Sequence, residues 1–197
     1  MHFRFPKRQR WVDWLLNQSG NDYLCKIDLS YIEDRFNLTR LNEDIPHFYE
    51  EALEMMIDQF DYRDYSEATR VAIENAAQHL YGLIHARYII TNSGMSQMIA
   101  KYKKGVFGVC PRHYCDDQPL LPVGLSDLPQ KKTVKMYCPR CTDVYQCSSP
   151  NHINLDGAYF GTTFAHLLLQ SDPTLINDTS FQRYTPRIYG FKIASSQ

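Results

Sequence analysis

The sequence contains no long apolar run, no excess of one sign of charge and no motif of nucleotide binding. No stretch approaches the ~18 consecutive apolar residues of a membrane-spanning helix, so we expect no membrane partner. The formal net charge of the 197 residues is −1, which argues against a protein built to bind polyanions. Neither a glycine-rich phosphate loop nor a dinucleotide-binding fingerprint is present, so a nucleotide-dependent enzyme has no motif support.

The first residues also lack the features of a secretory leader. The stretch MHFRFPKRQRWVDWLL is basic and then aromatic, without a long apolar region or a small-residue cleavage site. Six cysteines could form a disulfide scaffold, but the missing leader and the paired spacing favour a reducing compartment and a metal. We therefore expect the protein in the cytoplasm and the nucleus.

Two short helices are expected in the first third of the chain. Ser30, with Glu33 three residues later, forms a capping-box pattern that predicts the start of a helix. Pro46 lies where the first turn of a second helix would tolerate proline. The apolar face predicted for that second helix contains Phe48, Ala52, Met55 and Met56.

A longer helix follows, because apolar residues recur at helical spacing. They are Ile73, Ala76, Ala77, Leu80, Leu83, Ile84 and Tyr88. A further helix is expected from near Asn92 to Lys104, since Gly105 is a favourable residue just beyond a helix C-terminus. Together these patterns predict an all-helical domain over residues 8–104.

The composition changes after Gly105, where prolines, glycines and cysteines separate short β-prone runs. The runs KKTVKMYC, TDVYQC and RIYGFKI predict a small antiparallel sheet with long loops. LLQSDPTLINDTSFQRYTP is predicted to be an exposed linker. The expected fold class is therefore α+β, with a sheet domain over residues 105–165 and a linker with an extended C-terminal segment over residues 166–197.

Two cysteine pairs lie in the second half of the chain, with 22 residues between them. Cys110 and Cys115 form the first pair, and Cys138 and Cys141 form the second. Two such pairs can supply the four ligands of a tetrahedral zinc ion at about 2.3 Å, although four buried or disulfide-linked cysteines would be an alternative. Four thiolates leave no open position for water, so we predict one structural Zn²⁺ per chain that supplies folding free energy and performs no reaction.

Other candidates for chemistry have simpler structural interpretations. Cys25 is predicted to be a small core residue, whereas Cys147 and His113 could compete for the metal. His85 and Arg87 lie two residues apart on a predicted helix and point to different sides, so a structural role is predicted for each. We expect no enzymatic activity.

The stretch PRIYGFKI, residues 186–193, is the last apolar segment of the chain. In a strand, Tyr189, Phe191 and Ile193 would share one face, and Gly190 would permit close approach of another backbone. Such a segment could be part of the core of its own domain, or it could fill a hydrophobic groove of a partner protein. The residues themselves leave both interpretations open.

The chain resembles the regulatory β subunit of casein kinase II, a Ser/Thr protein kinase. The similar stretches are RFNLTRLNEDIPHF, LYGLIHARYIITNSGM, CPRHYCDDQPLLPVGLSDLP, VKMYCPRCTDVY, DGAYFGTTFAH and PRIYGFKI. The resemblance implies an all-α domain, a zinc-ribbon-like three-stranded sheet, and a homodimer formed by the zinc domains. It also implies that each C-terminal segment binds one catalytic α subunit. The β subunit would be non-catalytic, and would stabilise the kinase, modulate its activity, shift its substrate choice and recruit protein substrates.

The resemblance also assigns site residues. Tyr189 and Phe191 match aromatic anchors for the catalytic subunit, and Leu167 falls at another apolar contact to it. The expected site residues are the zinc ligands Cys110, Cys115, Cys138 and Cys141 and the docking residues Leu167, Tyr189, Phe191 and Ile193. The alternative function is a nucleic-acid-binding zinc ribbon, motivated by QKKTVK and the basic N-terminus, but the net charge of −1 argues against it.

Three stretches depart from the family pattern, and together they predict a divergent paralogue; one of them is the tail after GFKI, which is reduced here to ASSQ. There is no serine or threonine before Ser19, so the N-terminal phosphorylation found in the family is not expected here. The acidic loop of the family is reduced to DYRDYSEATR, in which Arg63 and Arg70 dilute the negative charge. We therefore expect a weaker attraction to polyamines.

Overall fold

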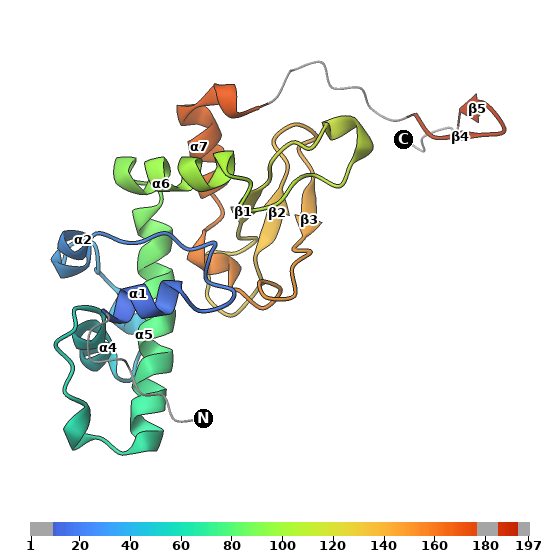
Figure 1. The fold of residues 1–197 in the computed structure, drawn as a ribbon. Helices are drawn as coiled ribbons and strands as arrows, with labels where there is room; N and C mark the ends of the chain where they lie inside the picture. The colour runs from blue at the N-terminus through green and yellow to red at the C-terminus, as the bar shows by residue number, and fades with distance from the viewer. Residues whose placement is uncertain (1–9, 177–184, 193–197) are drawn as a thin grey trace.

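The computed structural model describes residues 10–176 and 185–192, and the statements below refer to these residues (Figure 1). The docking residue Ile193 lies outside them. The first part of the chain is helical: α1 Trp11–Leu16, α2 Leu29–Glu33, α3 Leu41–Asp44, α4 Tyr49–Met56, α5 Glu67–Tyr88 and α6 Asn92–Lys103. The second part contains a small antiparallel sheet, and the expected α+β fold class is confirmed. No helix in the described ranges is long and apolar enough to cross a membrane.

Helix α6 spans Asn92–Lys103, close to the predicted range from near Asn92 to Lys104, and both long helices begin at a side-chain cap. The Ser66 side chain caps α5 by accepting a hydrogen bond from the Thr69 N–H, and Thr91 caps α6 by accepting one from the Gly94 N–H. Gly105, just past α6, has a φ of +70°, which suits a glycine after a helix. The predicted apolar face of α5 is buried at Ile73, Ala77, Leu80, Leu83, Ile84 and Tyr88, and Ala76 is partly buried against it.

The predicted starts of the two short helices were wrong. Helix α2 begins at Leu29 after an extended Asp28, so Ser30 lies inside the helix and forms no capping box. Helix α4 begins at Tyr49, because the preceding residue, Phe48, has a φ of +60°, which is outside the helical range. Pro46 therefore lies before the first turn of the helix. The predicted face of α4 is nevertheless buried at Ala52, Met55 and Met56.

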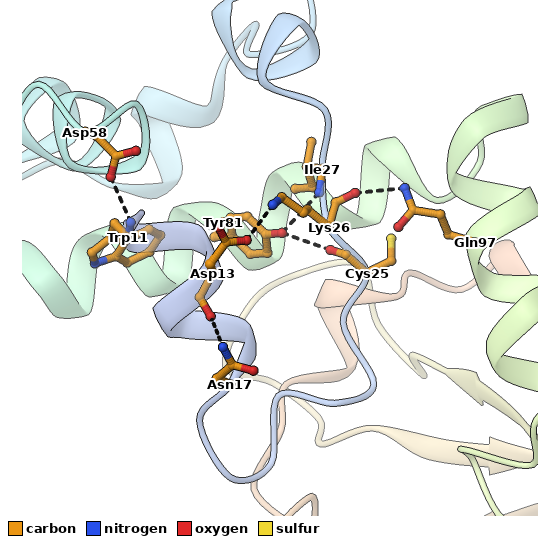
Figure 2. A network of polar contacts seen from close by, with 9 residues as sticks. All are labelled: Trp11, Asp13, Asn17, Cys25, Lys26, Ile27, Asp58, Tyr81 and Gln97. Carbon is orange, nitrogen blue, oxygen red and sulfur yellow. Dashed lines mark hydrogen bonds and ion pairs between the residues drawn. The ribbon is translucent and has the colours of Figure 1, made fainter. Parts of the chain in front are cut away.

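An extended N-terminal segment crosses α5, and its polar contacts are drawn in Figure 2. The Tyr81 hydroxyl of α5 donates to the Cys25 carbonyl (2.8 Å) and accepts from the Ile27 N–H (3.2 Å). The backbone N–H of Trp11, at the start of α1, donates to the Asp58 carboxylate at 2.8 Å. Cys25 is a buried core residue, as predicted.

The sheet of the second part has the strand order β1-β2-β3, with β1 Leu121–Val123, β2 Lys135–Tyr137 and β3 Val144–Gln146. The register pairs Leu121 with Tyr137, and Met136 with Tyr145. The runs predicted to be strands around β2 and β3 are confirmed. Strand β1 was not predicted because it contains Pro122, and an edge strand tolerates a residue that has no N–H to donate.

The segment predicted to be an exposed linker is partly folded. Its first residues belong to helix α7 Phe164–Ser171, which contacts β1, and a 3-10 turn, η4 Pro173–Leu175, follows directly. Leu168 and Leu175 are buried in the core, and this burial explains why the segment is ordered despite its polar composition. The prediction of an exposed linker was therefore wrong up to Leu175.

The helical part and the sheet part meet at Tyr159, in the 3-10 turn η3 Gly157–Tyr159. A side chain at Gly82 of α5 would collide with the Tyr159 ring, because a Cβ there would lie 2.4 Å from it. The Tyr159 hydroxyl contacts His79 Nδ1 at 2.9 Å, and its carbonyl oxygen lies 2.7 Å from His85 Nδ1. Buried residues from both parts join one hydrophobic cluster. The division of the chain at residues 104/105 and 165/166 stays a prediction.

Candidate metal centre

Two tight loops present the four paired cysteines. The second pair lies on the turn between β2 and β3, where the Thr142 N–H donates to the Cys138 carbonyl at 2.9 Å. The first pair lies on the loop before β1, which contains a short 3-10 turn, His113–Cys115. Positive φ values of 45° at Asp116 and 52° at Asp117 let this loop reverse direction directly after Cys115.

The four sulfur atoms converge in a buried site. Those of Cys110, Cys115, Cys138 and Cys141 all lie within 4.8 Å of one another. Two of them, on Cys110 and Cys141, are 3.9 Å apart. A tetrahedral site with zinc–sulfur bonds of about 2.3 Å has sulfur–sulfur edges of about 3.8 Å. The distance between Cys110 and Cys141 matches such an edge, and no other pair exceeds it by more than about 1 Å.

Polar groups surround one of the sulfurs. The Tyr145 hydroxyl lies 3.3 Å from Cys141 Sγ, close enough to donate a hydrogen bond to a thiolate. Burial alone would raise the pKa of Cys141, but hydrogen bonds from Tyr145, the Asp143 backbone and Arg112 lower it to about 7. This sulfur is therefore ready to serve as an anionic ligand near neutral pH.

The other thiols show why the cluster suits a cation. Burial, together with the neighbouring Cys110 and Cys141, raises the pKa of Cys115 to about 12, and burial raises the pKa of Cys138 as well. Four thiolates at this separation repel one another, and a divalent cation at the centre would remove that repulsion. All four positions of a tetrahedral ion would then be filled by sulfur, which is typical of a structural site.

The other metal-ligand candidates lie elsewhere. Cys147 contacts the Tyr23 hydroxyl at 3.7 Å and is not part of the four-sulfur cluster. His113 is exposed and lies edge-on against Tyr114.

Arg87 donates to the carbonyl groups of residues 37 and 39 and has the structural role expected of it.

The C-terminal segment forms a hairpin rather than one extended strand. Strand β4 Arg187–Ile188 pairs with β5 Phe191–Lys192, and Ile188 faces Phe191. Tyr189 and Gly190 form the turn, with φ values of +48° and +85°, a combination typical of two-residue hairpin loops. The predicted strand alternation from Tyr189 onward was therefore wrong.

The hairpin exposes its aromatic residues to solvent. Tyr189 is 97% exposed and Phe191 is 79% exposed, so neither belongs to the core of the chain. This burial pattern removes one of the two interpretations that the sequence left open. Leu167, the third docking candidate among the described residues, lies half-buried on α7.

Sequence reasoning missed two polar residues at the site. Tyr145 follows Cys141 by four residues, and only the pairing of β2 with β3 turns its hydroxyl toward the sulfur. Gln118 follows the first cysteine pair in the sequence and precedes β1, and its side chain is buried. No local sequence pattern distinguishes it from an exposed loop glutamine.

Comparison with known proteins identifies one family over nearly the whole chain. The family described as casein kinase II regulatory subunit matches residues 10–192. The chain is 52% identical to casein kinase II subunit beta of Schizosaccharomyces pombe over 187 residues, which are 95% of this chain and 80% of that protein. It is 51% identical to subunit beta-2 of Neurospora crassa, covering 93% of this chain and 64% of that protein. Identity to subunit beta of Dictyostelium discoideum is 49%, covering 94% of this chain and 69% of that protein.

Proposed function

The chain belongs to the casein kinase II regulatory subunit family, and we propose that it works as a non-catalytic subunit bound to the catalytic α subunit of this Ser/Thr kinase. The observation that carries the proposal is the family match over residues 10–192, which includes both the cysteine cluster and the exposed hairpin. In this role the chain stabilises the kinase, modulates its activity, and influences which protein substrates it phosphorylates.

The metal in this proposal is one structural Zn²⁺ per chain, held by the four clustered cysteines. Their sulfur atoms match the ligand type, number and spacing that zinc prefers. Zinc would supply folding free energy to a sheet of three-residue strands, which is too small to be stable alone.

We further propose that two copies pair through their metal-binding sheets. Apolar side chains near the cluster are exposed, including Val109 (47%), Val144 (47%) and Tyr114. Exposed apolar groups gathered in one region are typical of protein interfaces. Two chains joined in this way would present two hairpins and bind two catalytic subunits.

The hairpin is the proposed docking element for the catalytic subunit. Its turn places Tyr189 and Phe191 outward, where they can enter a hydrophobic groove of the partner together with Leu167 of α7. We place the assembled complex in the cytoplasm and the nucleus.

Co-expression with the catalytic subunit tests the proposal. We expect the two chains to purify together, and native mass spectrometry to give two copies of each chain and one zinc ion for each copy of this chain. A chain that remains alone in the presence of excess catalytic subunit would refute the proposed function.

A further inference from the structure

The C-terminal hairpin starts from a fixed point, which we call the tail root and define as residues 172–176. Leu175 in the tail root is the last buried residue before the hairpin among the described residues, with 5% exposure, and residues 185–192 are all exposed. In the proposed function, Leu167 and the hairpin contact the same partner. Two linked contacts strengthen each other only when the chain between them lets both reach the partner at the same time. The point from which that chain starts therefore affects binding.

Two buried polar side chains hold the tail root. The Tyr102 hydroxyl of α6 donates to the Leu175 carbonyl at 2.8 Å. Gln118 Nε2 donates to the same carbonyl at 3.2 Å and to the Tyr102 hydroxyl at 2.5 Å. Gln118 is fully buried, and burial raises the pKa of Tyr102 to about 12, so the hydroxyl remains a donor at neutral pH. Buried hydrogen bonds of this kind fix the position of the groups they join.

The backbone of Gln118 belongs to the loop over residues 110–118, which carries Cys110 and Cys115 and which we call the metal loop. The Cys110 N–H donates to the Gln118 carbonyl at 2.8 Å, and the Gln118 N–H donates to the Cys115 carbonyl at 2.9 Å. One residue therefore closes the loop that carries the first two sulfur ligands and also reaches the tail root with its side chain. A metal ion held by Cys110 and Cys115 would fix the shape of this loop, and with it the position of the Gln118 amide.

We propose that Gln118 is a positioning residue that joins the metal centre to the tail root, so that the geometry of the metal loop sets how well the hairpin docks on the kinase subunit. This inference rests on the proposed function and deepens it. The closed metal centre then has a second effect beyond stabilising the sheet, because it determines where the docking segment leaves the body of the protein.

Replacing Gln118 with leucine tests the proposal, since leucine fills similar space but donates no hydrogen bond. We expect Gln118→Leu to retain its zinc and its self-association, to exchange amide hydrogens faster at residues 172–176, and to bind the catalytic subunit about fivefold to tenfold more weakly. Tyr102→Phe, which removes one hydroxyl with little change of volume, should shift both measurements in the same direction. Tyr102→Phe therefore tests the proposal even if Gln118→Leu folds poorly.

Two control variants separate positioning from general destabilisation. Gln130→Leu makes the same chemical change at an exposed glutamine of the same part of the chain, and should leave both measurements unchanged. Ile73→Val removes a methylene from the core of α5, and should lower stability without changing kinase affinity.

The outcomes distinguish the positioning role of Gln118 from the proposed function as a kinase subunit. Unaltered kinase affinity in both Gln118→Leu and Tyr102→Phe, measured at full zinc content, would overturn the role of Gln118. Equal loss of affinity in Ile73→Val would overturn it as well. If the unaltered chain does not bind the catalytic subunit at all, the proposed function is wrong, and the exchange rates at residues 172–176 still decide whether Gln118 holds the tail root.

Discussion

Acidification should weaken the joint between the helical part and the sheet part, because that joint contains a neutral, fully buried imidazole. His85 Nε2 accepts a hydrogen bond from the Cys25 N–H at 3.0 Å, so the ring proton must lie on Nδ1, which donates to the Tyr159 carbonyl at 2.7 Å. Protonation of Nε2 would place an N–H against the Cys25 N–H in a fully buried site. Burial, helped by the positive charge of Lys101, lowers the pKa of His85 to about 4.

The sign and size of the effect follow from this shift. The folded pKa lies below the ordinary value of about 6.5, so the unfolded chain binds the proton more readily between the two values. The stabilisation is fully present above about pH 6.5 and is lost as the pH falls toward about 4. A difference of about 2.5 pKa units corresponds to about 3 kcal/mol in total, of which about 2 kcal/mol is lost between about pH 7.5 and about pH 5.

The His85→Gln variant isolates this contribution, because glutamine does not titrate while the carboxylates and cysteines remain. Denaturant unfolding of zinc-loaded protein at both pH values should show that the unaltered chain loses about 2 kcal/mol more stability than the variant. A nuclear magnetic resonance titration of the His85 ring should give a midpoint near the folded value. The same pH dependence in both chains, or a His85 ring that titrates near its ordinary pKa, would show that His85 does not cause the loss of stability in acid.

Three further variants test other parts of the structure. Cys110→Ser removes one of the four converging sulfurs, so elemental analysis and mass measurement should show loss of zinc and of self-association; a dimer with one zinc per chain would contradict the assigned ligands. Tyr189→Ala with Phe191→Ala removes two exposed side chains, so calorimetry should show kinase binding weakened by about 2 kcal/mol or more, with zinc content unchanged; unchanged affinity would exclude the hairpin from docking. Gly82→Ala places a methyl group against the Tyr159 ring and should lower the unfolding free energy by about 1–3 kcal/mol, whereas an unchanged melting temperature would show that the ring moves freely.

The long helices and the cysteine pairs could be predicted because their signals are local. Seven apolar residues at helical spacing define the buried face of α5, and the spacing of the cysteines alone suggests four converging sulfurs. Such patterns depend on residues a few positions apart. Tertiary contacts change them little.

The features that were missed depend on contacts between distant segments. Pro122 argues against a strand until the sheet order shows that β1 is an edge. The polar sequence around Leu175 predicts a linker until Tyr102 and Gln118 supply partners for its backbone. The Tyr189–Gly190 turn was missed because a bulky aromatic residue rarely adopts the positive φ that it has here.

The contact between Gly82 and Tyr159 has a consequence for how the sequence can change over time. The Tyr159 ring occupies the space where a side chain at position 82 would lie, so a substitution at either position alters the fit of the other. A side chain gained at position 82 should be tolerated only in chains that carry a smaller residue at position 159. These two positions, 77 residues apart in the chain, should therefore vary as a pair or not at all.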